Sequence, residues 1–214
     1  MGSIDYKKLY DLQDQVLDIV FKTETIFYLT GGTCLSRFYK AKRYSDDLDF
    51  FTHINYDFNR AVKEIKNALS QRFNIAEEVN SKDFIRYKID DFLQIDFVND
   101  RVARYGKPVY LENGYIIDNI ENILSNKITA VVSRDNAKDI FDIYLIDKFY
   151  SLDWNDILKI AHKKASFDDQ DLIIRLKTFP VILLKSIILV DDTFLDNFEV
   201  EYNLIIDKIE KVII

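Results

Sequence analysis

Apolar residues recur at two different spacings along the chain, and the spacing changes near its middle. In the first half, short runs of β-branched and aromatic residues alternate with segments of helical spacing. This pattern predicts helices at residues 6–22, 35–39 and 58–69. It predicts strands at residues 25–30, 48–51, 84–89 and 93–98, with weaker candidates at 108–111 and 115–117. Asp90 and Asp91 separate two of these strands and predict a hairpin turn.

From residue 120 onward the apolar spacing is helical almost throughout. It predicts helices at residues 120–131, 137–149, 154–164, 169–178, 181–189 and 202–213. The sequence therefore predicts an α/β (α+β) fold, with a mixed β-sheet core, flanking helices and a mostly helical C-terminal half. We expect an α/β core at residues 1–118 and a helical part at 119–214 that packs on it.

Composition narrows the class of protein. The 214 residues are 48% hydrophobic and 30% charged, which is typical of a globular chain. A single cysteine, Cys34, excludes an intramolecular disulfide, and the distant His53 and His162 leave a Cys/His zinc site without ligands. The longest apolar stretch, residues 181–190, is too short for a membrane span, and residues 1–14 carry no secretory signal. We expect a cytoplasmic protein with no membrane contact.

The net charge of −7 excludes a globally basic surface for nucleic acid, although a local basic patch remains compatible with it. Lys40, Lys42 and Arg43 form one such cluster in the sequence. The cluster is either a place for an RNA backbone or an ordinary solvated face.

Gly31, Gly32 and Thr33 lie between a predicted strand and a predicted helix. Two glycines allow the backbone to approach a ligand closely, and a helix N-terminus favours anions. The turn is therefore either a phosphate cradle or a simple connection. It is not a Walker loop, because no Gly-Lys-Ser/Thr follows.

Asp47 and Asp49 are two residues apart in a predicted strand, so their carboxylates share one face. Two neighbouring carboxylates repel, and a divalent cation such as Mg²⁺ would hold them. The alternative is an exposed acidic loop.

Asp96 interrupts another apolar strand, where a charge is costly unless it is paired or bound to a metal. The alternative is an edge strand that turns Asp96 toward water. If the strands of Asp47, Asp49 and Asp96 are neighbours, three carboxylates meet, as in sites that hold two metal ions.

Together these motifs resemble the DNA polymerase β-type nucleotidyltransferase superfamily. The resemblance is carried by Gly-Gly-Thr, a short helix, Arg-Tyr-Ser-Asp-Asp-Leu-Asp-Phe at residues 43–50, and a later lone strand aspartate. The string YLTGGTCLSRFYKAKRYSDDLDFF, residues 28–51, is more closely similar to the AbiEii/AbiGii toxins of bacterial abortive-infection and toxin–antitoxin pairs. We judge this resemblance to cover about residues 6–150.

The resemblance implies a role for each motif residue. Asp47 and Asp49 would be the first pair of metal ligands, and Asp96 the third carboxylate. The metal would be Mg²⁺, or Mn²⁺ in its place, and a nucleoside triphosphate would be the co-substrate. The residues that would hold or lie near the triphosphate are Gly31, Gly32, Thr33, Arg43 and Ser45.

Lys127 lies on the apolar face of its predicted helix, which suggests either a snorkelling side chain or a phosphate contact. Family members carry such a lysine, followed by an arginine and a (Lys/Arg)-Asp-x-x-Asp element. Here these are Arg134, Asp139 and Asp142. The resemblance implies that Lys127 and Asp139 serve nucleotide binding and that Lys127 and Asp142 serve catalysis. The alternative is an ordinary charged helix face.

The sequence thus predicts a Mg²⁺-dependent nucleotidyltransferase that moves a nucleoside monophosphate to an acceptor hydroxyl. By resemblance, the acceptor is RNA, at the 3′ end of a tRNA, and the protein is a toxin with a cognate antitoxin or transcriptional regulator as partner. One alternative is a catalytically inactive protein of this fold that binds a nucleotide or a partner. Another is a small-molecule (antibiotic) nucleotidyltransferase.

Overall fold

The structure, a computed structural model, describes residues 4–102 and 104–213. The chain divides into two compact units. The first unit comprises Met1–Cys34, Ser45–Val102 and Lys107–Asp118, and the second comprises Leu35–Tyr44, Ala103–Gly106 and Asn119–Ile214. The sequence predicts a division into residues 1–118 and 119–214. Of these, residues 1–3, 103 and 214 lie outside the described residues. That predicted division and the packing of its two parts stay predictions.

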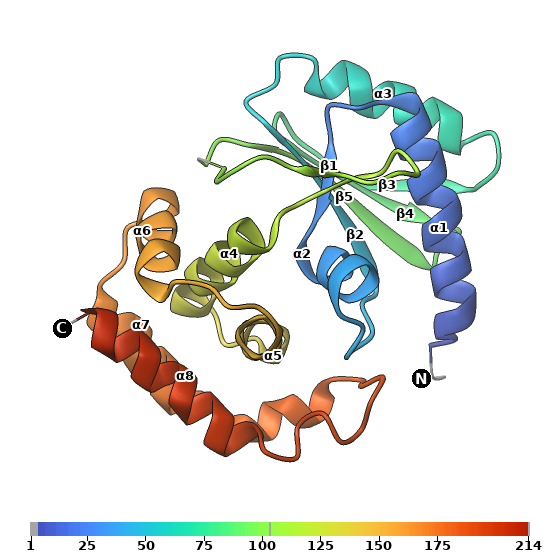
Figure 1. Cartoon of the computed structure of the whole chain (residues 1–214). Coiled ribbons are helices and arrows are strands. Elements are labelled where there is room, and N and C mark those ends of the chain that lie inside the picture. The colour runs from blue at the N-terminus through green and yellow to red at the C-terminus, as the bar shows by residue number, and fades with distance from the viewer. Residues whose placement is uncertain (1–3, 103, 214) are drawn as a thin grey trace. The chain divides into compact units, whose positions relative to one another are not determined.

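A mixed sheet forms the centre of the first unit and confirms the predicted fold class (Figure 1). Among the described residues it has the order β3-β4-β5-β2-β1-β7-β6. Its strands are β1 (Tyr28–Thr30), β2 (Asp47–His53), β3 (Ile75–Asn80), β4 (Phe84–Ile89), β5 (Leu93–Asp100), β6 (Val109–Tyr110) and β7 (Ile116–Ile117). Strand β2 runs antiparallel to β1 and parallel to β5. Strand β3 was not predicted, because nearly all of its residues are exposed and give no alternating pattern.

The predicted hairpin turn is confirmed between β4 and β5. Asp90 and Asp91 have φ angles of 49° and 54°, in the left-handed region that short polar residues tolerate best. The turn sets an antiparallel register in which Ile89 pairs with Leu93. This register determines which side chains of the two strands face each other.

Helices α1 (Tyr6–Thr23) and α3 (Phe58–Leu69) contact each other, and α1 also contacts β5, in the first unit (Figure 1). Leu48 and Phe50 alternate with polar residues on β2, so they fall on one face. The ring of Phe50 lies 5.7 Å from that of Phe21 on α1 and 5.2 Å from that of Phe97 on β5. This face carries the apolar core, and the opposite face of β2 carries Asp47 and Asp49.

The second unit is mainly helical. Its elements are η1 (Leu35–Tyr39), α4 (Ile120–Ser133), α5 (Ala137–Phe149), α6 (Trp154–Lys164), α7 (Asp169–Thr178), η2 (Val181–Ser186) and α8 (Phe198–Ile213). A four-residue helix, α2 (Gly31–Cys34), ends the first segment of the first unit. In the part of the chain that the structure describes, no helix combines the length and apolarity needed to span a membrane.

The helix predicted at residues 181–189 is confirmed only in its first part. A 3₁₀ helix occupies Val181–Ser186, and the chain then becomes extended, so that Leu189 forms an antiparallel bridge with Arg43. The run Ile187–Val190 is rich in β-branched residues, which favour extended backbone. The last helix begins at Phe198 and not at residue 202.

Candidate active site

The three predicted metal ligands lie on neighbouring strands of the first unit. In the parallel β2–β5 pair, Asp49 is in register with Asp96, and Asp47 lies two residues from Asp49 on the same face. Asp47 and Asp49 are half-buried, whereas Asp96 is only 6% exposed. The predicted adjacency of the two strands is therefore confirmed.

Gly31 begins α2 directly beside Asp49. Its φ angle is +72°, and a Cβ atom at this position would lie 2.5 Å from Asp49 Oδ2. Any residue with a side chain would thus be strained in its backbone and would collide with the carboxylate. The absence of a side chain at Gly31 therefore lets the Asp49 carboxylate lie directly against the turn.

The Thr33 hydroxyl ties this turn to the carboxylate strand. Thr33 is fully buried, and its Oγ1 donates a hydrogen bond to the backbone carbonyl of Asp47. Gly32, between Gly31 and Thr33, is half-buried. The turn and β2 therefore hold each other in place. A direct contact from Gly31, Gly32 or Thr33 to phosphate stays a prediction.

Arg86 on β4 binds the third carboxylate. Its Nε and Nη2 atoms donate to the two oxygens of Asp96, each at 2.7 Å, and Gln94 Nε2 adds a hydrogen bond of 3.3 Å. The bond with Asp96 raises the pKa of Arg86. Sequence reasoning missed Arg86. The hairpin register could have revealed it, because pairing Ile89 with Leu93 places Arg86 opposite Asp96.

These residues fit a divalent metal only in part. Asp47 and Asp49 offer hard oxygen donors on one face, which suit Mg²⁺ or Mn²⁺. Within residues 4–102 and 104–213, however, no three His, Cys, Asp or Glu side chains gather as a ligand set. Asp96 is engaged by Arg86 instead. The metal site stays a prediction, and it requires Arg86 to release Asp96.

The loop that enters β2 is anchored to α1. Ser45 is buried. Its backbone N–H donates to the hydroxyl of Tyr10 at 3.2 Å, and its carbonyl accepts from Gln13 Nε2 at 3.1 Å. The neighbouring Asp46 accepts a hydrogen bond of 3.0 Å from the Tyr6 hydroxyl. These contacts fix the start of the strand that carries Asp47 and Asp49.

A buried carboxylate that the sequence reasoning passed over lies at the end of β7. Asp118 accepts a 2.7 Å hydrogen bond from Thr30 Oγ1, and its N–H bonds to the carbonyl of Leu29 at 2.8 Å. Burial and the charge of Asp118 raise the pKa of the Cys34 thiol well above its ordinary value. Cys34 therefore behaves as a small buried apolar residue.

The other predicted site residues meet in the second unit, in an ion network that is largely buried. Arg43, only 2% exposed, donates from Nε and Nη2 to the two oxygens of Asp142, both at 2.8 Å. Lys127 Nζ lies 2.8 Å from Asp142 Oδ2 and 2.9 Å from Asp139 Oδ1. Arg134 Nε completes the network at 2.7 Å from Asp139 Oδ2.

The network keeps all of its members charged. Burial opposes the charge of Lys127, but Asp142 and Asp139 outweigh it and raise the pKa of the ammonium group. Burial likewise opposes the charge of Asp142, but Arg43 and Lys127 lower the pKa of this carboxyl. The pKa of Asp139 is lowered, against its burial, by Lys127 and Arg134. The geometry thus excludes the ordinary exposed helix face as the explanation for Lys127 and the two acids.

The predicted basic cluster at residues 40–43 is largely engaged within the second unit. Arg43 is buried against Asp142, and Lys42 Nζ forms a 2.7 Å ion pair with Asp191. Lys40 Nζ lies 4.9 Å from the ring centre of Phe149. Arg43 and Lys42 are thus paired within the chain, whereas Lys40 is exposed.

Solved structures have folds similar to that of this chain. It matches MenT4, the nucleotidyltransferase toxin Rv2826c from Mycobacterium tuberculosis H37Rv, with a TM-score of 0.66, 13% identity, and coverage of 96% of this chain and 84% of that one. It also matches JHP933 from Helicobacter pylori, with a TM-score of 0.55, 23% identity, and coverage of 100% and 89%. The fold is that of a nucleotidyltransferase.

A comparison of the sequence with protein families assigns this chain to one of them. The profile described as "Nucleotidyl transferase AbiEii toxin, Type IV TA system" matches residues 17–211. The chain belongs to this family, so it is a nucleotidyltransferase toxin, and its type IV toxin–antitoxin membership implies a nucleotide substrate and an antitoxin partner. It is also 27% identical over 150 residues to "Uncharacterized protein aq_aa25" of Aquifex aeolicus (strain VF5), covering 70% of this chain and 71% of that protein.

Proposed function

We propose that this toxin is a Mg²⁺-dependent enzyme, also served by Mn²⁺, that transfers a nucleoside monophosphate from a nucleoside triphosphate to the 3′-terminal hydroxyl of an RNA. A tRNA is the acceptor we favour. One observation carries the proposal: Asp47, Asp49 and Asp96 share one face of β2 and β5, and the turn at Gly31 lies directly against Asp49. This arrangement suits metal-assisted phosphoryl transfer.

In the first unit, Asp47 and Asp49 would hold the metal. Bound there, Mg²⁺ would neutralise charge on the phosphates and favour ionisation of the acceptor hydroxyl. Once Arg86 has released Asp96, the carboxylate of Asp96 would accept the proton of the acceptor hydroxyl. The acceptor oxygen then bonds to the α-phosphorus, the bond from the α-phosphorus to the bridging oxygen breaks, and pyrophosphate leaves.

In the second unit, Lys127 would contact the triphosphate as a point charge. We assign Asp139 and Asp142 to positioning. Both are buried carboxylates in direct ion pairs with Lys127, and both oxygens of Asp142 are bound by Arg43. The lowered pKa of Asp142 makes it a weak base, so we propose that it orients Lys127 and Arg43 and takes no proton.

A small hydroxylated molecule is the second candidate acceptor. The net charge of −7 and the engagement of Lys42 and Arg43 within the chain both weaken the attraction of a polyanion. The family description supports a toxin but specifies no acceptor. We also propose that the partner antitoxin is a transcriptional regulator and that the enzyme acts in the cytoplasm, where RNA and nucleoside triphosphates are available.

The test is transfer of label from each of the four α-labelled nucleoside triphosphates, with Mg²⁺ or Mn²⁺, to total RNA, purified tRNA or a panel of hydroxylated antibiotics. We expect label on tRNA, and no label on tRNA whose 3′ end has been oxidised. Asp47→Asn should abolish transfer, and Asp46→Asn is the matched control because that carboxylate adjoins Asp47 but binds Tyr6. Label on the antibiotics alone would move the acceptor to the second candidate. Binding of nucleotide without its consumption would indicate an inactive member of the family.

A further inference from the structure

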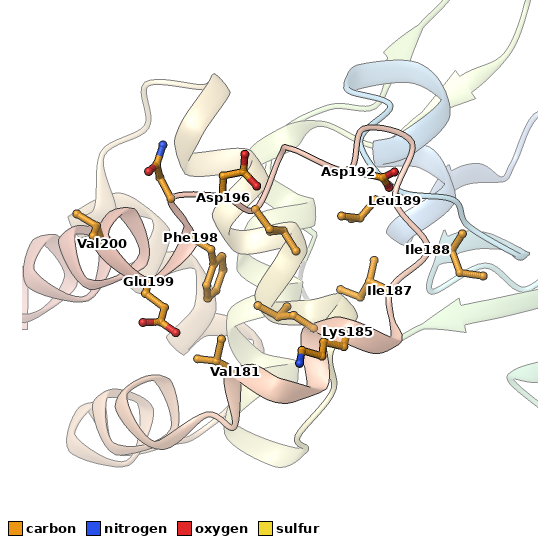
Figure 2. Close-up of a pocket in the computed structure, with 13 residues that line it drawn as sticks. Val181, Lys185, Ile187, Ile188, Leu189, Asp192, Asp196, Phe198, Glu199 and Val200 are labelled. Carbon is orange, nitrogen blue, oxygen red and sulfur yellow. The ribbon is translucent and has the colours of Figure 1, made fainter.

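A groove lies in the C-terminal part of the second unit, among residues that the proposed chemistry does not use. It has a volume of about 790 Å³ and is formed by η2, the extended chain after it and the start of α8 (Figure 2). Leu184, Ile187 and Phe198 line it and are almost fully buried. We call this feature the C-terminal groove. Its walls include residues 187–189, which were predicted to be helical but are extended.

Backbone pairing fixes one wall of the C-terminal groove. The N–H of Tyr44 donates to the carbonyl of Ile188 at 2.9 Å, and the N–H of Val190 donates to the carbonyl of Lys42 at 3.0 Å. The ion pair between Lys42 and Asp191 follows directly after this pairing and holds the end of the extended chain. The extended chain is therefore held in place, and a ligand would meet a preformed surface.

The apolar surface extends beyond the groove along α8. Ile188 and Val200 line the groove and are 51% and 69% exposed. Leu204 follows Val200 by one helical turn and is also exposed, at 55%. Exposed apolar side chains beside a groove typically mark an interaction site. A small molecule would fill the groove but leave the stripe on α8 uncovered, so the surface favours a segment of another protein.

The charges around the groove are mainly negative. Asp192, Asp196 and Glu199 line it, and Figure 2 shows the first two on one side and Glu199 on another. Among its described lining residues, Lys185 is the only cation. These four side chains form no hydrogen bond or ion pair with other described residues. The complementary partner is cationic and apolar, and the same charges repel RNA.

We propose that the C-terminal groove binds an amphipathic helix of a partner protein, with an apolar stripe at i, i+4 and i+7 and Lys or Arg on its flanks. The apolar stripe would pack against Phe198, Ile188 and Val200, as in other complexes in which a helix lies in a groove. The basic flanks would approach Asp192, Asp196 and Glu199. None of the residues that line this groove is assigned to nucleotidyl transfer.

The first test uses a fluorescein-labelled synthetic helix of about 15 residues with Leu at the stripe positions and Lys on the flanks. Fluorescence anisotropy with the full chain should give a dissociation constant in the micromolar range. Val200→Lys should weaken binding at least about tenfold. Ile174→Lys is the matched control, because Ile174 is an exposed apolar helix residue outside the groove, and it should bind like the wild type. Absence of binding, or equal effects of both substitutions, would overturn the proposal.

The second test concerns charge. A peptide with Glu in place of Lys should not bind, and the triple variant Asp192→Asn, Asp196→Asn, Glu199→Gln should bind the Lys peptide several-fold more weakly, with less dependence on salt. Equal binding of the two peptides would contradict the proposed chemistry. Sedimentation of the wild type should show no self-association that Val200→Lys removes. Such an effect would make a second copy of this chain the occupant and overturn the proposal, as would displacement of the peptide by tRNA.

Discussion

Two pairs of aspartates in this enzyme each lie close together in the sequence but differ in their surroundings. Asp47 and Asp49 on β2 are half-buried, and no ion pair is recorded for the carboxylate of Asp47 within the described residues. Asp139 and Asp142 on α5 are almost fully buried, and three cations from α4, the following loop and the segment before β2 neutralise them. One aspartate pair thus lies on the face of a strand, and the other lies in a buried network whose cations balance its charge.

The difference indicates different roles. A carboxylate pair whose charge is balanced by fixed cations contributes to the order of its unit and has little capacity for a further cation. A pair of carboxylates that share one face of a strand is the kind of oxygen donor set that a divalent ion takes, which is why we propose the metal there. Asp96 is intermediate, since it adjoins Asp49 but is held by Arg86. The counter-ions around an acidic motif are therefore the criterion by which we distinguish a proposed metal site from a structural ion pair.

The largest expected effect is the loss of activity in Asp47→Asn or Asp49→Asn. If these carboxylates hold the metal, labelled transfer should fall about 10⁴-fold, or roughly 5 kcal/mol of transition-state stabilisation. The melting temperature should stay constant or rise, because the substitution removes repulsion between neighbouring carboxylates. Asp46→Asn should leave transfer unchanged. A variant at Asp47 that keeps full activity would remove this pair from the mechanism.

The next effect is on stability and concerns the other pair. Asp142→Asn should lower the free energy of unfolding of the second unit by about 3–5 kcal/mol, because Arg43 and Lys127 lose a buried counter-ion. Lys127→Met should cost less, since Asp142 keeps Arg43 and Asp139 keeps Arg134. Urea unfolding followed by fluorescence of Trp154, the only tryptophan and a buried residue of α6, reports on this unit. Equal stability of Asp142→Asn and wild type would contradict a structural role for the network.

The buried ion network should also make the stability of the second unit depend on pH. The pKa values of Asp139 and Asp142 are lowered, so the stability they contribute is complete above their unfolded values of about 4 and is lost as the pH falls through the folded values. The pKa of Lys127 is raised, so its contribution is complete below about pH 10 and is lost as the pH rises through the folded value. Trp154 fluorescence should therefore show a broad stable range, with a shallower acid limb in Asp142→Asn. Identical acid limbs would contradict these assignments.

The smallest effect concerns Arg86. Arg86→Gln should strengthen Mn²⁺ binding by up to about tenfold, because a cation that competes for Asp96 is removed. Arg101→Gln is the matched control, since Arg101 forms a two-bond contact with Asp83 in the same unit. The readout is the Mn²⁺ dissociation constant from electron paramagnetic resonance, which needs no turnover. An unchanged or weaker constant would show that Arg86 does not withhold Asp96.

Much of the fold was accessible from local sequence patterns. Helices α5, α6 and α7 have the predicted bounds, because their apolar residues follow a clear helical period. The hairpin at Asp90 and Asp91 was also accessible. Strand β3 was not, since its side chains are exposed. The end of the helix predicted at residues 181–189 was misplaced, because the short apolar runs on either side of Lys185 and Ser186 do not distinguish helix from extended chain.

The candidate site was accessible only where its residues lie close together in the sequence. Asp47 and Asp49 could be placed on one face from their spacing alone. The partners of the acids could not: Asp142 binds Arg43 across 99 residues, and Asp96 binds Arg86 through a strand register. Counter-ions depend on tertiary structure, and they decide whether a carboxylate is available to a metal.

The most direct test of this account is Mn²⁺ binding, measured by electron paramagnetic resonance, to the wild type, Asp49→Asn and Asp139→Asn. We expect the wild type and Asp139→Asn to bind Mn²⁺ alike, and Asp49→Asn to lose that binding. A wild type that binds no Mn²⁺, or an Asp49→Asn variant that binds it as well as the wild type, would contradict the assignment of the strand carboxylates as the metal site.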